Sequence, residues 1–195
     1  MIRLFTALSK SVIDRLTDED AFNKATDGFK CHNEHCPRCG STGKLSPYGD
    51  YARWLVSTDG KNVFSKHIRP LRFECRSCGT THVLLPDTLT PYSPYSLRFK
   101  FTVLIAYFER EQTVAYVCER FGIAISTIYE WIKLFLSHKE LLLGIVASRR
   151  EPALVFLVGL LSDIRISDLL MGFFHQYAVS FLQAKPIPAT YCLPP

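Results

Sequence analysis

The sequence has no apolar run long enough to cross a lipid bilayer. The longest run, Ala153–Leu161, is about half of the ~20 residues that a helical span requires. The first residues, Met1–Phe5, contain neither a long apolar segment nor a small-residue cleavage site, so we expect no secretory signal. These absences exclude membrane transporters and receptors from the expected functions and favour a protein of the cytoplasm.

Signatures of catalysis are also missing. There is no Gly-rich phosphate-binding loop, and the Ser, His and Asp residues form no recognisable catalytic pattern. The segment beyond residue 139 has no β-rich pattern, and it is shorter than the ~100–150 residues of a domain that could carry a three-carboxylate transposase site. We therefore expect no enzymatic activity. The carboxylates of that segment are Glu140, Glu151, Asp163 and Asp168.

Surplus positive charge is absent from the second half of the chain. Residues 1–100 hold 15 Lys and Arg against 10 Asp and Glu, whereas residues 101–195 hold eight of each. The formal net charge of +5 therefore belongs to the first half. A mild basic excess permits a nucleic-acid partner, and this distribution assigns the attraction for phosphate to residues 1–100.

What the sequence does have is an unusual set of seven cysteines. Four of them form two copies of the pattern Cys-x-x-Cys-Gly, at 36–40 and 75–79. Each copy places two thiolates on one tight turn, where the glycine permits a positive φ, and four thiolates match the tetrahedral preference of zinc. We predict one closed, structural zinc ion in a reducing compartment. Its ligands are Cys36, Cys39, Cys75 and Cys78.

Four further residues near the two copies have side chains of metal-binding type. Any of them could replace a ligand or hold a second metal, and the alternative is that they are ordinary surface residues. These residues are Cys31, His32, His35 and His82.

The sequence between the two copies is typical of β structure. Tyr51–Val56 is rich in aromatic and branched residues, Asp59–Asn62 is a strong turn signal, and Val63–Cys75 largely alternates apolar and polar residues. A hairpin here would bring the two cysteine pairs together. We therefore predict a small antiparallel zinc-ribbon module over residues 31–90, preceded by a loosely packed extension over residues 1–30.

The remaining sequence is typical of helices. Three prolines at 86–96 mark a linker, and Ser93–Pro94 is a helix-start signal. Apolar residues then recur at helical spacing, which predicts helices near 95–110, 114–121 and 125–136. The resulting divisions are a tri-helical domain over residues 91–140, a C-terminal helical region over 141–184 and a tail over 185–195.

The second and third of these helices have the spacing of a helix-turn-helix motif, with Gly122 closing the first of the pair. In that motif the second helix enters the major groove of DNA with its N-terminal end toward the bases. The alternative is a helical hairpin whose outer face is only solvated. The expected buried positions are Val117, Phe121, Ile123, Ile128 and Trp131. The candidate DNA contacts are Arg120, Ser126, Thr127, Tyr129, Glu130 and Lys133.

Three residues depart from the usual motif. Ala124 replaces a Ser or Thr cap, Ile125 replaces a polar residue, and Glu130 adds a negative charge to the contact face. Because phosphate attraction dominates non-specific affinity, basic residues of the ribbon would have to cooperate. The alternative is that these residues line an ordinary solvated strand face. They are Arg53, Lys61, Lys66, Arg69, Arg72 and Arg76.

With both motifs in place, the chain resembles a family of uncharacterised, transposon-related bacterial proteins that combine an N-terminal zinc ribbon with a helix-turn-helix. The resemblance covers residues 31–136 and implies DNA binding, with transposon ends as an expected target. It is carried by the sequences at 36–41, 48–54, 73–82, 84–87, 91–93 and 126–133.

The sequence thus predicts an α+β chain in which a small antiparallel zinc-ribbon module precedes a helix-turn-helix domain and C-terminal helices. The expected function is that of a transposon-related accessory or regulatory protein that binds double-stranded DNA in the cytoplasm, at the nucleoid. The alternative is a protein-interaction adaptor. For the C-terminal helices two hypotheses stand: packing onto the tri-helical core, or a homodimer interface.

Overall fold

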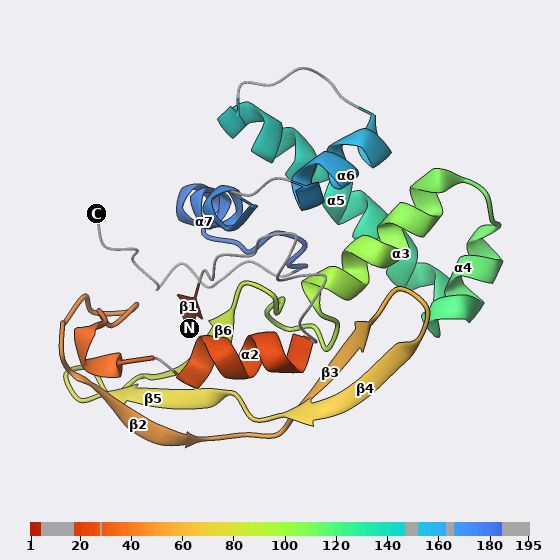
Figure 1. Ribbon diagram of the computed structural model, residues 1–195. Helices are drawn as coiled ribbons and strands as arrows, with labels where there is room; N and C mark the ends of the chain where they lie inside the picture. Colours follow the sequence, from red (N-terminus) through yellow and green to blue (C-terminus); the bar gives the residue numbers. More distant parts are fainter. Residues whose placement is uncertain (5–17, 28, 147–151, 163–165, 185–195) are drawn as a thin grey trace.

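The fold is α+β, as predicted, with the strands in the first half of the chain and most of the helices in the second. A computed structural model describes residues 1–4, 18–27, 29–146, 152–162 and 166–184. Figure 1 shows the strands as one layer with the later helices above it. The expected features at Glu151, Asp163 and the 185–195 tail lie outside the described residues.

A long antiparallel hairpin forms the lower layer of the molecule (Figure 1). Its strands are β2 (Leu45–Asp50), β3 (Arg53–Thr58), β4 (Val63–Ile68) and β5 (Leu71–Cys75). The part near the cysteines pairs β2 with β5, and the part near the tip pairs β3 with β4. The tip is the predicted turn, where the Asp59 carboxylate accepts hydrogen bonds from the backbone N–H groups of Lys61 and Asn62.

Two more strands extend one edge of this hairpin. Strand β6 (Thr81–Pro86) pairs antiparallel with β5, and β1 (Ile2–Leu4) pairs parallel with β6. The sheet is therefore mixed, in the order β1-β6-β5-β2. The expectation of a loosely packed extension is wrong at this strand, because Ile2 is 5% exposed and lies opposite Leu84. A strand of three residues is too short to show a periodic pattern.

Helix α2 (Asp18–Asp27) lies beside the hairpin and packs on it through Phe22. The Phe22 side chain is buried in one cluster with Leu55, Ile68 and Leu85, so it joins the helix to β6 as well as to the hairpin strands. A short 3-10 turn, η1 (Cys31–Asn33), precedes the first cysteine pair.

The helical half begins one turn later than the linker signal indicates. Its helices are α3 (Leu97–Glu109), α4 (Val114–Phe121), α5 (Ile125–Val146), α6 (Ala153–Ser162) and α7 (Ile166–Tyr177). Ser96 caps α3, because its hydroxyl accepts a hydrogen bond from Phe99 N at 3.0 Å. The hydroxyl of the predicted cap, Ser93, instead accepts from Tyr95 N within the loop.

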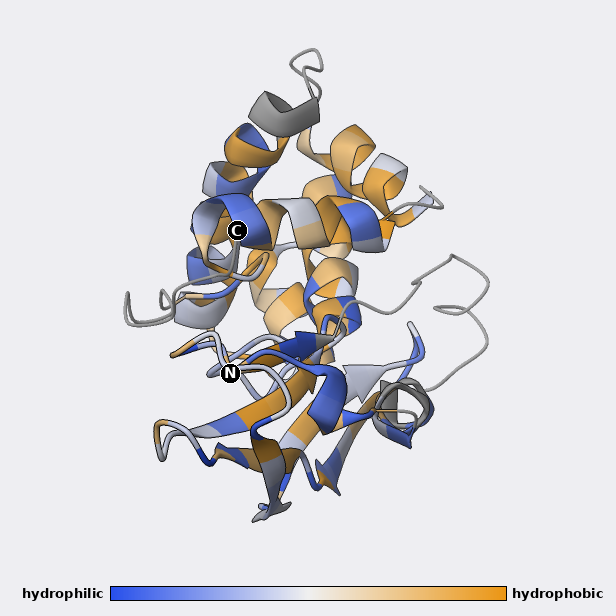
Figure 2. Cartoon of the chain, turned by 90° about the vertical axis from the view of Figure 1, so that its left-hand side faces the viewer, coloured by the Kyte–Doolittle hydropathy of each residue, from blue (hydrophilic) through white to orange (hydrophobic). Residues whose placement is uncertain are grey.

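The main hydrophobic core lies among the helices. Helix α3 is buried on more than one side, as expected, with Phe99, Phe101, Val103 and Leu104 all inaccessible or nearly so. Helices α6 and α7 bury apolar side chains on the same core, which agrees with the packing hypothesis for the C-terminal region. Figure 2 shows that hydrophobic residues dominate these helices, whereas the strands mix hydrophobic and hydrophilic residues.

The residues that follow α7 return to the core as a buried turn. The Leu182 side chain is fully buried, and both of its backbone groups are hydrogen bonded to helical side chains. Its carbonyl accepts from Lys100 Nζ at 3.0 Å, and its N–H donates to His138 Nδ1 at 3.0 Å. The turn is thereby fixed to α3 and α5. Within the part of the chain that the structure describes, no helix is both long and apolar enough to cross a membrane.

Candidate functional site

The two cysteine loops have the same backbone geometry. In the first knuckle (Cys36–Ser41), Gly40 N donates to Cys36 O, and in the second (Cys75–Thr80), Gly79 N donates to Cys75 O. Gly40 and Gly79 both adopt positive φ, at 71° and 66°. Other residues rarely adopt this conformation, so the predicted role of both glycines is confirmed.

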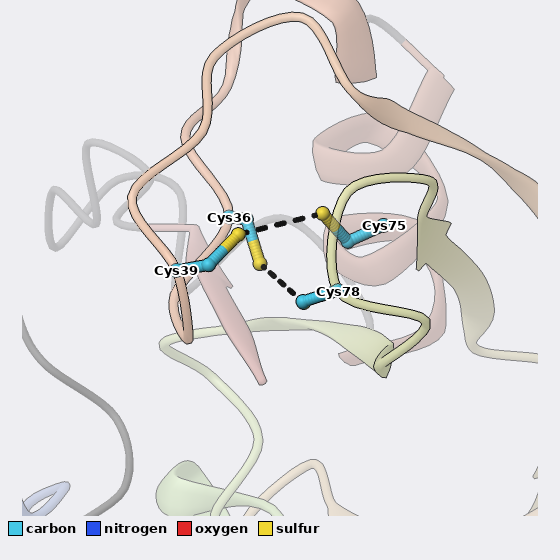
Figure 3. A group of neighbouring side chains, drawn as sticks. All are labelled: Cys36, Cys39, Cys75 and Cys78. Carbon is cyan, nitrogen blue, oxygen red and sulfur yellow. Dashed lines mark hydrogen bonds between the residues drawn. The ribbon is translucent and has the colours of Figure 1, made fainter.

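The two knuckles bring the four predicted ligands together. All four Sγ atoms lie within 4.8 Å of one another, and Figure 3 shows them converging from two separate loops. The Cys36–Cys78 and Cys39–Cys75 Sγ distances are both 3.7 Å. A tetrahedral ion with metal–sulfur bonds of about 2.3 Å requires sulfur atoms roughly 3.8 Å apart. The cluster is therefore of the right size to hold one four-coordinate metal ion.

The environment of the thiols differs between the exposed and the buried ligands. Hydrogen bonds from Ser41 lower the pKa of Cys39 to about 6, and those from Thr80 lower the pKa of Cys78. Burial raises the pKa of Cys36 to about 12. A buried thiolate is costly unless a cation compensates its charge, so a metal ion is what would stabilise Cys36 in its ionised form.

His82 lies beside the cluster rather than in it. Its Nε2 atom is 3.2 Å from Cys36 Sγ, and its Nδ1 atom is 3.2 Å from the α-amino group of Met1. Burial lowers the pKa of His82 to about 4, so the ring is neutral. Burial also lowers the pKa of the Met1 amino group to about 5, and the His82 tautomer that carries its proton on Nε2 would donate to the Cys36 sulfur. Such a donor orients a metal ligand from behind.

The other three metal-binding candidates do not join the cluster. Among the described residues the group that can hold a metal contains only the four cysteines. Cys31 packs half-buried against the small core beneath the knuckles, while His32 and His35 are exposed. The alternative that these are ordinary surface residues therefore holds for His32 and His35, whereas Cys31 is half-buried.

The second candidate site is formed by α4 and α5. Helix α4 begins after Thr113, whose side chain accepts from Tyr116 N, and it ends at Gly122, where φ is +64°. Ile123 N then donates to Cys118 O, which closes the turn. The five positions expected to be buried are all buried: Val117, Phe121, Ile123, Ile128 and Trp131.

Most of the candidate DNA contacts lie together on α5. Ser126, Tyr129, Glu130 and Lys133 are exposed, and their spacing of three and four residues places them on one helix face. Thr127 lies at the border of this face and is half-buried. Helix α5 therefore presents a polar, solvent-accessible strip that begins at its N-terminal turn.

Arg120 has a partner that the sequence does not indicate. Its guanidinium donates to the carbonyl of Gly60, at the tip of the β3–β4 hairpin, at 3.0 Å, and lies over the Phe121 ring. The tip of the hairpin is thus attached to the last turn of α4, and Figure 1 shows the two elements side by side.

The negative charge of Glu130 lies near a buried lysine, Lys100. Lys100 is only 2% exposed, and its Nζ atom is 5.5 Å from the centre of the Trp131 ring. Burial lowers the pKa of Lys100 to about 7, and the charge of Glu130 opposes this shift. Sequence reasoning missed Lys100, although a lysine inside the apolar pattern of α3 is a visible signal.

The basic residues of the ribbon are not equivalent. Arg53 is half-buried and donates to the carbonyl oxygens of Thr90 and Ser93, so it fixes the linker instead of facing solvent. Arg69 forms an ion pair with Asp50. The remaining four lie at or near the surface: Lys61, Lys66 and Arg76 are exposed, and Arg72 stacks over the Tyr48 ring.

Comparison with known proteins gives one family match. Residues 36–131 match the model of a family described as a domain of unknown function (DUF6431). The matched segment, just under half of the chain, runs from the first metal-site cysteine to Trp131 in α5, and it includes the hairpin and α4. No curated protein and no solved structure matches the chain. The matched segment thus contains the four-cysteine cluster, α4 and the first turns of α5, and the description of the family names no activity.

Proposed function

We propose that this protein binds double-stranded DNA through α4 and α5, which act as a helix-turn-helix, and that the knuckles hold one structural zinc ion. The observation that carries the proposal is the exposed face of α5 at Ser126, Tyr129, Glu130 and Lys133, which lies opposite a fully buried face. The closed turn at Gly122 supports it, because it sets the helix crossing that the motif needs.

In this proposal the N-terminal turns of α5 enter the major groove. Ser126, Thr127 and Tyr129 supply hydroxyl groups that can exchange hydrogen bonds with base edges, and Glu130 can accept from the amino group of cytosine. Lys133, one turn further along the same face, neutralises a phosphate. These contacts would give a short recognition sequence.

The metal centre has a structural role in this proposal. Four thiolates fill the tetrahedral coordination of zinc and leave no position for a reactive water. The ion would hold the two knuckles together and fix the base of the hairpin. We therefore propose no catalytic activity for the chain and an accessory or regulatory role related to transposition, in the cytoplasm at the nucleoid.

A homodimer through the C-terminal helices is part of the proposal. Helix-turn-helix proteins often bind paired half-sites as dimers. Val155 and Val158 on α6 are about half exposed, and Met171 on α7 is also exposed, although both helices pack on the core through their other faces. These side chains offer an apolar surface for a second copy.

The test is binding of the zinc-loaded chain to a random duplex pool, followed by fluorescence anisotropy over a range of salt concentrations. Lys133→Ala should weaken binding and lower the salt-dependence slope by about 1. Lys30→Ala is the matched control, because Lys30 is also exposed but lies next to η1. Absence of binding to any duplex, or binding that is insensitive to salt, would overturn the proposal.

The adaptor hypothesis is tested by the same protein. A stable protein partner that remains after nuclease treatment, together with no affinity for duplex DNA, would favour it. In that case the exposed face of α5 would be the first surface to map by substitution.

A further inference from the structure

We propose that the tip of the β3–β4 hairpin is a second DNA-contacting element, which lies against the sugar–phosphate backbone beside the groove that α5 enters. The inference rests on the proposed function and deepens it. It assigns the contact to Lys61, and it assigns Arg120 the role of holding the tip in position.

The first step is that the hairpin tip lies against the last turn of α4, a few residues before α5 begins. The hydrogen bond from Arg120 to Gly60 O joins the tip to the last turn of α4. Gly122 and Ile123 then turn the chain directly into α5. Anything bound to the first turns of α5 is therefore close to the tip of the hairpin.

The second step is that the tip is preorganised. Thr58 is buried, and its hydroxyl donates to Asn62 O and accepts from Gly60 N. The Asp59 carboxylate accepts from the backbone N–H groups of Lys61 and Asn62 and from the Asn62 amide. The backbone of Lys61 is thus fixed before any ligand arrives, which reduces the entropic cost of a contact.

The third step is the chemistry of the exposed side chains. Lys61 is exposed, and Phe64 and Val63 on the adjoining strand are 43% and 38% exposed. Val63 and Phe64 are successive residues of β4 and point to opposite faces of the strand, so the contact with the DNA backbone rests on the Lys61 cation, with one of the two apolar side chains on the same face. Asp59 and Glu119 bring negative charge to the same region, and the three N–H groups around the Asp59 carboxylate partly offset its charge. The net attraction is therefore modest and depends on Lys61.

Arg120 acts as a positioning residue in this arrangement. If its guanidinium neutralised a phosphate directly, its removal would lower the salt-dependence slope as the removal of Lys61 does. If Arg120 instead holds the hairpin tip, its removal weakens binding only because the contact between Lys61 and the phosphate is weakened. The two roles therefore give different results in a double-mutant cycle.

The experiment uses the full, zinc-loaded chain and a duplex selected from the random pool. Lys61→Ala should weaken binding by about threefold to tenfold and lower the salt slope by about 1. Arg120→Ala should weaken binding in the wild-type background and have little further effect in the Lys61→Ala background. In hydroxyl-radical footprinting, the complex with Lys61→Ala should lose protection of the DNA backbone at the positions that flank the α5 site. Circular dichroism and metal content serve as controls for folding.

The outcomes separate the two proposals. If Lys133→Ala weakens binding while Lys61→Ala and Phe64→Ala leave affinity, slope and footprint unchanged, the inference about the hairpin tip is wrong and the proposed function stands. Additive effects of Arg120→Ala and Lys61→Ala would overturn the positioning role of Arg120. If the wild-type chain binds no duplex, the proposed function and this inference fail together.

Discussion

Single polar side chains connect distant parts of this chain at buried positions. Lys100 and His138 together satisfy both backbone groups of Leu182, and His82 joins the N-terminal amino group to Cys36. Each of these groups is removed from water, where an unpaired polar atom is costly. Substitutions at these positions should therefore lower the free energy of unfolding by more than the loss of a single exposed hydrogen bond would.

Replacing His138 tests the acid stability of the helical core. Burial, and secondly the charge of Lys100, lower the pKa of His138 to about 4. The unfolded chain therefore binds the proton first, and stability is lost as pH falls from about 6.5 to about 4. His138→Asn keeps an acceptor for Leu182 N and does not titrate, so its unfolding free energy should fall less over that window. Urea denaturation at several pH values measures the difference, and parallel curves would contradict the expectation.

Replacing His82 tests its role behind the metal ligand. His82→Phe removes the Nε2 contact with Cys36 Sγ and should weaken metal affinity on the order of tenfold, while His82→Gln should retain part of that affinity. Competition with a chelator of known affinity measures the change. The matched control is His35→Ala, because His35 is exposed and outside the cluster. Equal affinity for the wild type and His82→Phe would show that the hydrogen bond has no such role.

At the scale of elements, local signals account for the parts that sequence analysis located well. The turn at Asp59–Asn62 and the start of α4 at Thr113 are fixed by side chains within a few residues of the backbone that they bond. Helix α4 ends where Gly122 adopts a positive φ and its backbone N–H donates to the last carbonyl groups of the helix. Ser93 shows the limit of such signals, since Ser96 has equal capping chemistry and lies where the chain turns into α3.

The C-terminal cap of α4 provides an element-scale prediction. Gly122 has a φ of +64°, and a Cβ there would meet no atom within 4 Å, so the cost of a side chain is backbone strain alone. Gly122→Ala should lower the unfolding free energy by about 1 kcal/mol. Gly159→Ala, in the exposed middle of α6, should instead raise it, because alanine favours a helix. Thermal unfolding followed at 222 nm compares them, and equal shifts would contradict the cap argument.

At the scale of the whole molecule, the described residues form one large helical core and two small cores around the strands. The core beneath the knuckles contains Cys36 and Cys75 themselves, next to Leu45 and Phe73. Few apolar side chains surround these cysteines, so a metal ion bound by them would supply much of the cohesion of that end. None of the four cysteines belongs to the helical core.

Removal of the metal should therefore unfold the two halves unequally. With a strong chelator, the knuckles and the adjoining part of the hairpin should lose protection from hydrogen exchange, while α3 and α5 keep theirs. Far-UV circular dichroism should retain most of its helical signal. Hydrogen exchange followed by mass spectrometry checks both, and uniform loss of protection across the chain would show that the halves unfold together. Magnesium-saturated chelator is the control.

The long-range features were beyond prediction from this sequence. Ile2 pairs with Leu84, and Lys100 bonds to Leu182, across more than eighty positions in each case. Neither contact has a periodic or capping signal, because it depends on which surfaces remain uncovered once the local elements have formed. The metal cluster was predictable despite its long spacer, since two matched knuckles have few other uses.

The shape of the hairpin also determines an order of events in time. Its tip is held by contacts over four residues, whereas Leu45 and Cys75 pair at the opposite end. Closing the short loop is fast and each later pair is then local, so the strands should zip from the tip and assemble the four thiolates last. Metal capture by the refolding chain should consequently reach a rate ceiling at high metal concentration, which stopped-flow refolding can measure. A rate that rises with concentration without limit would mean that the thiolates gather before the hairpin closes.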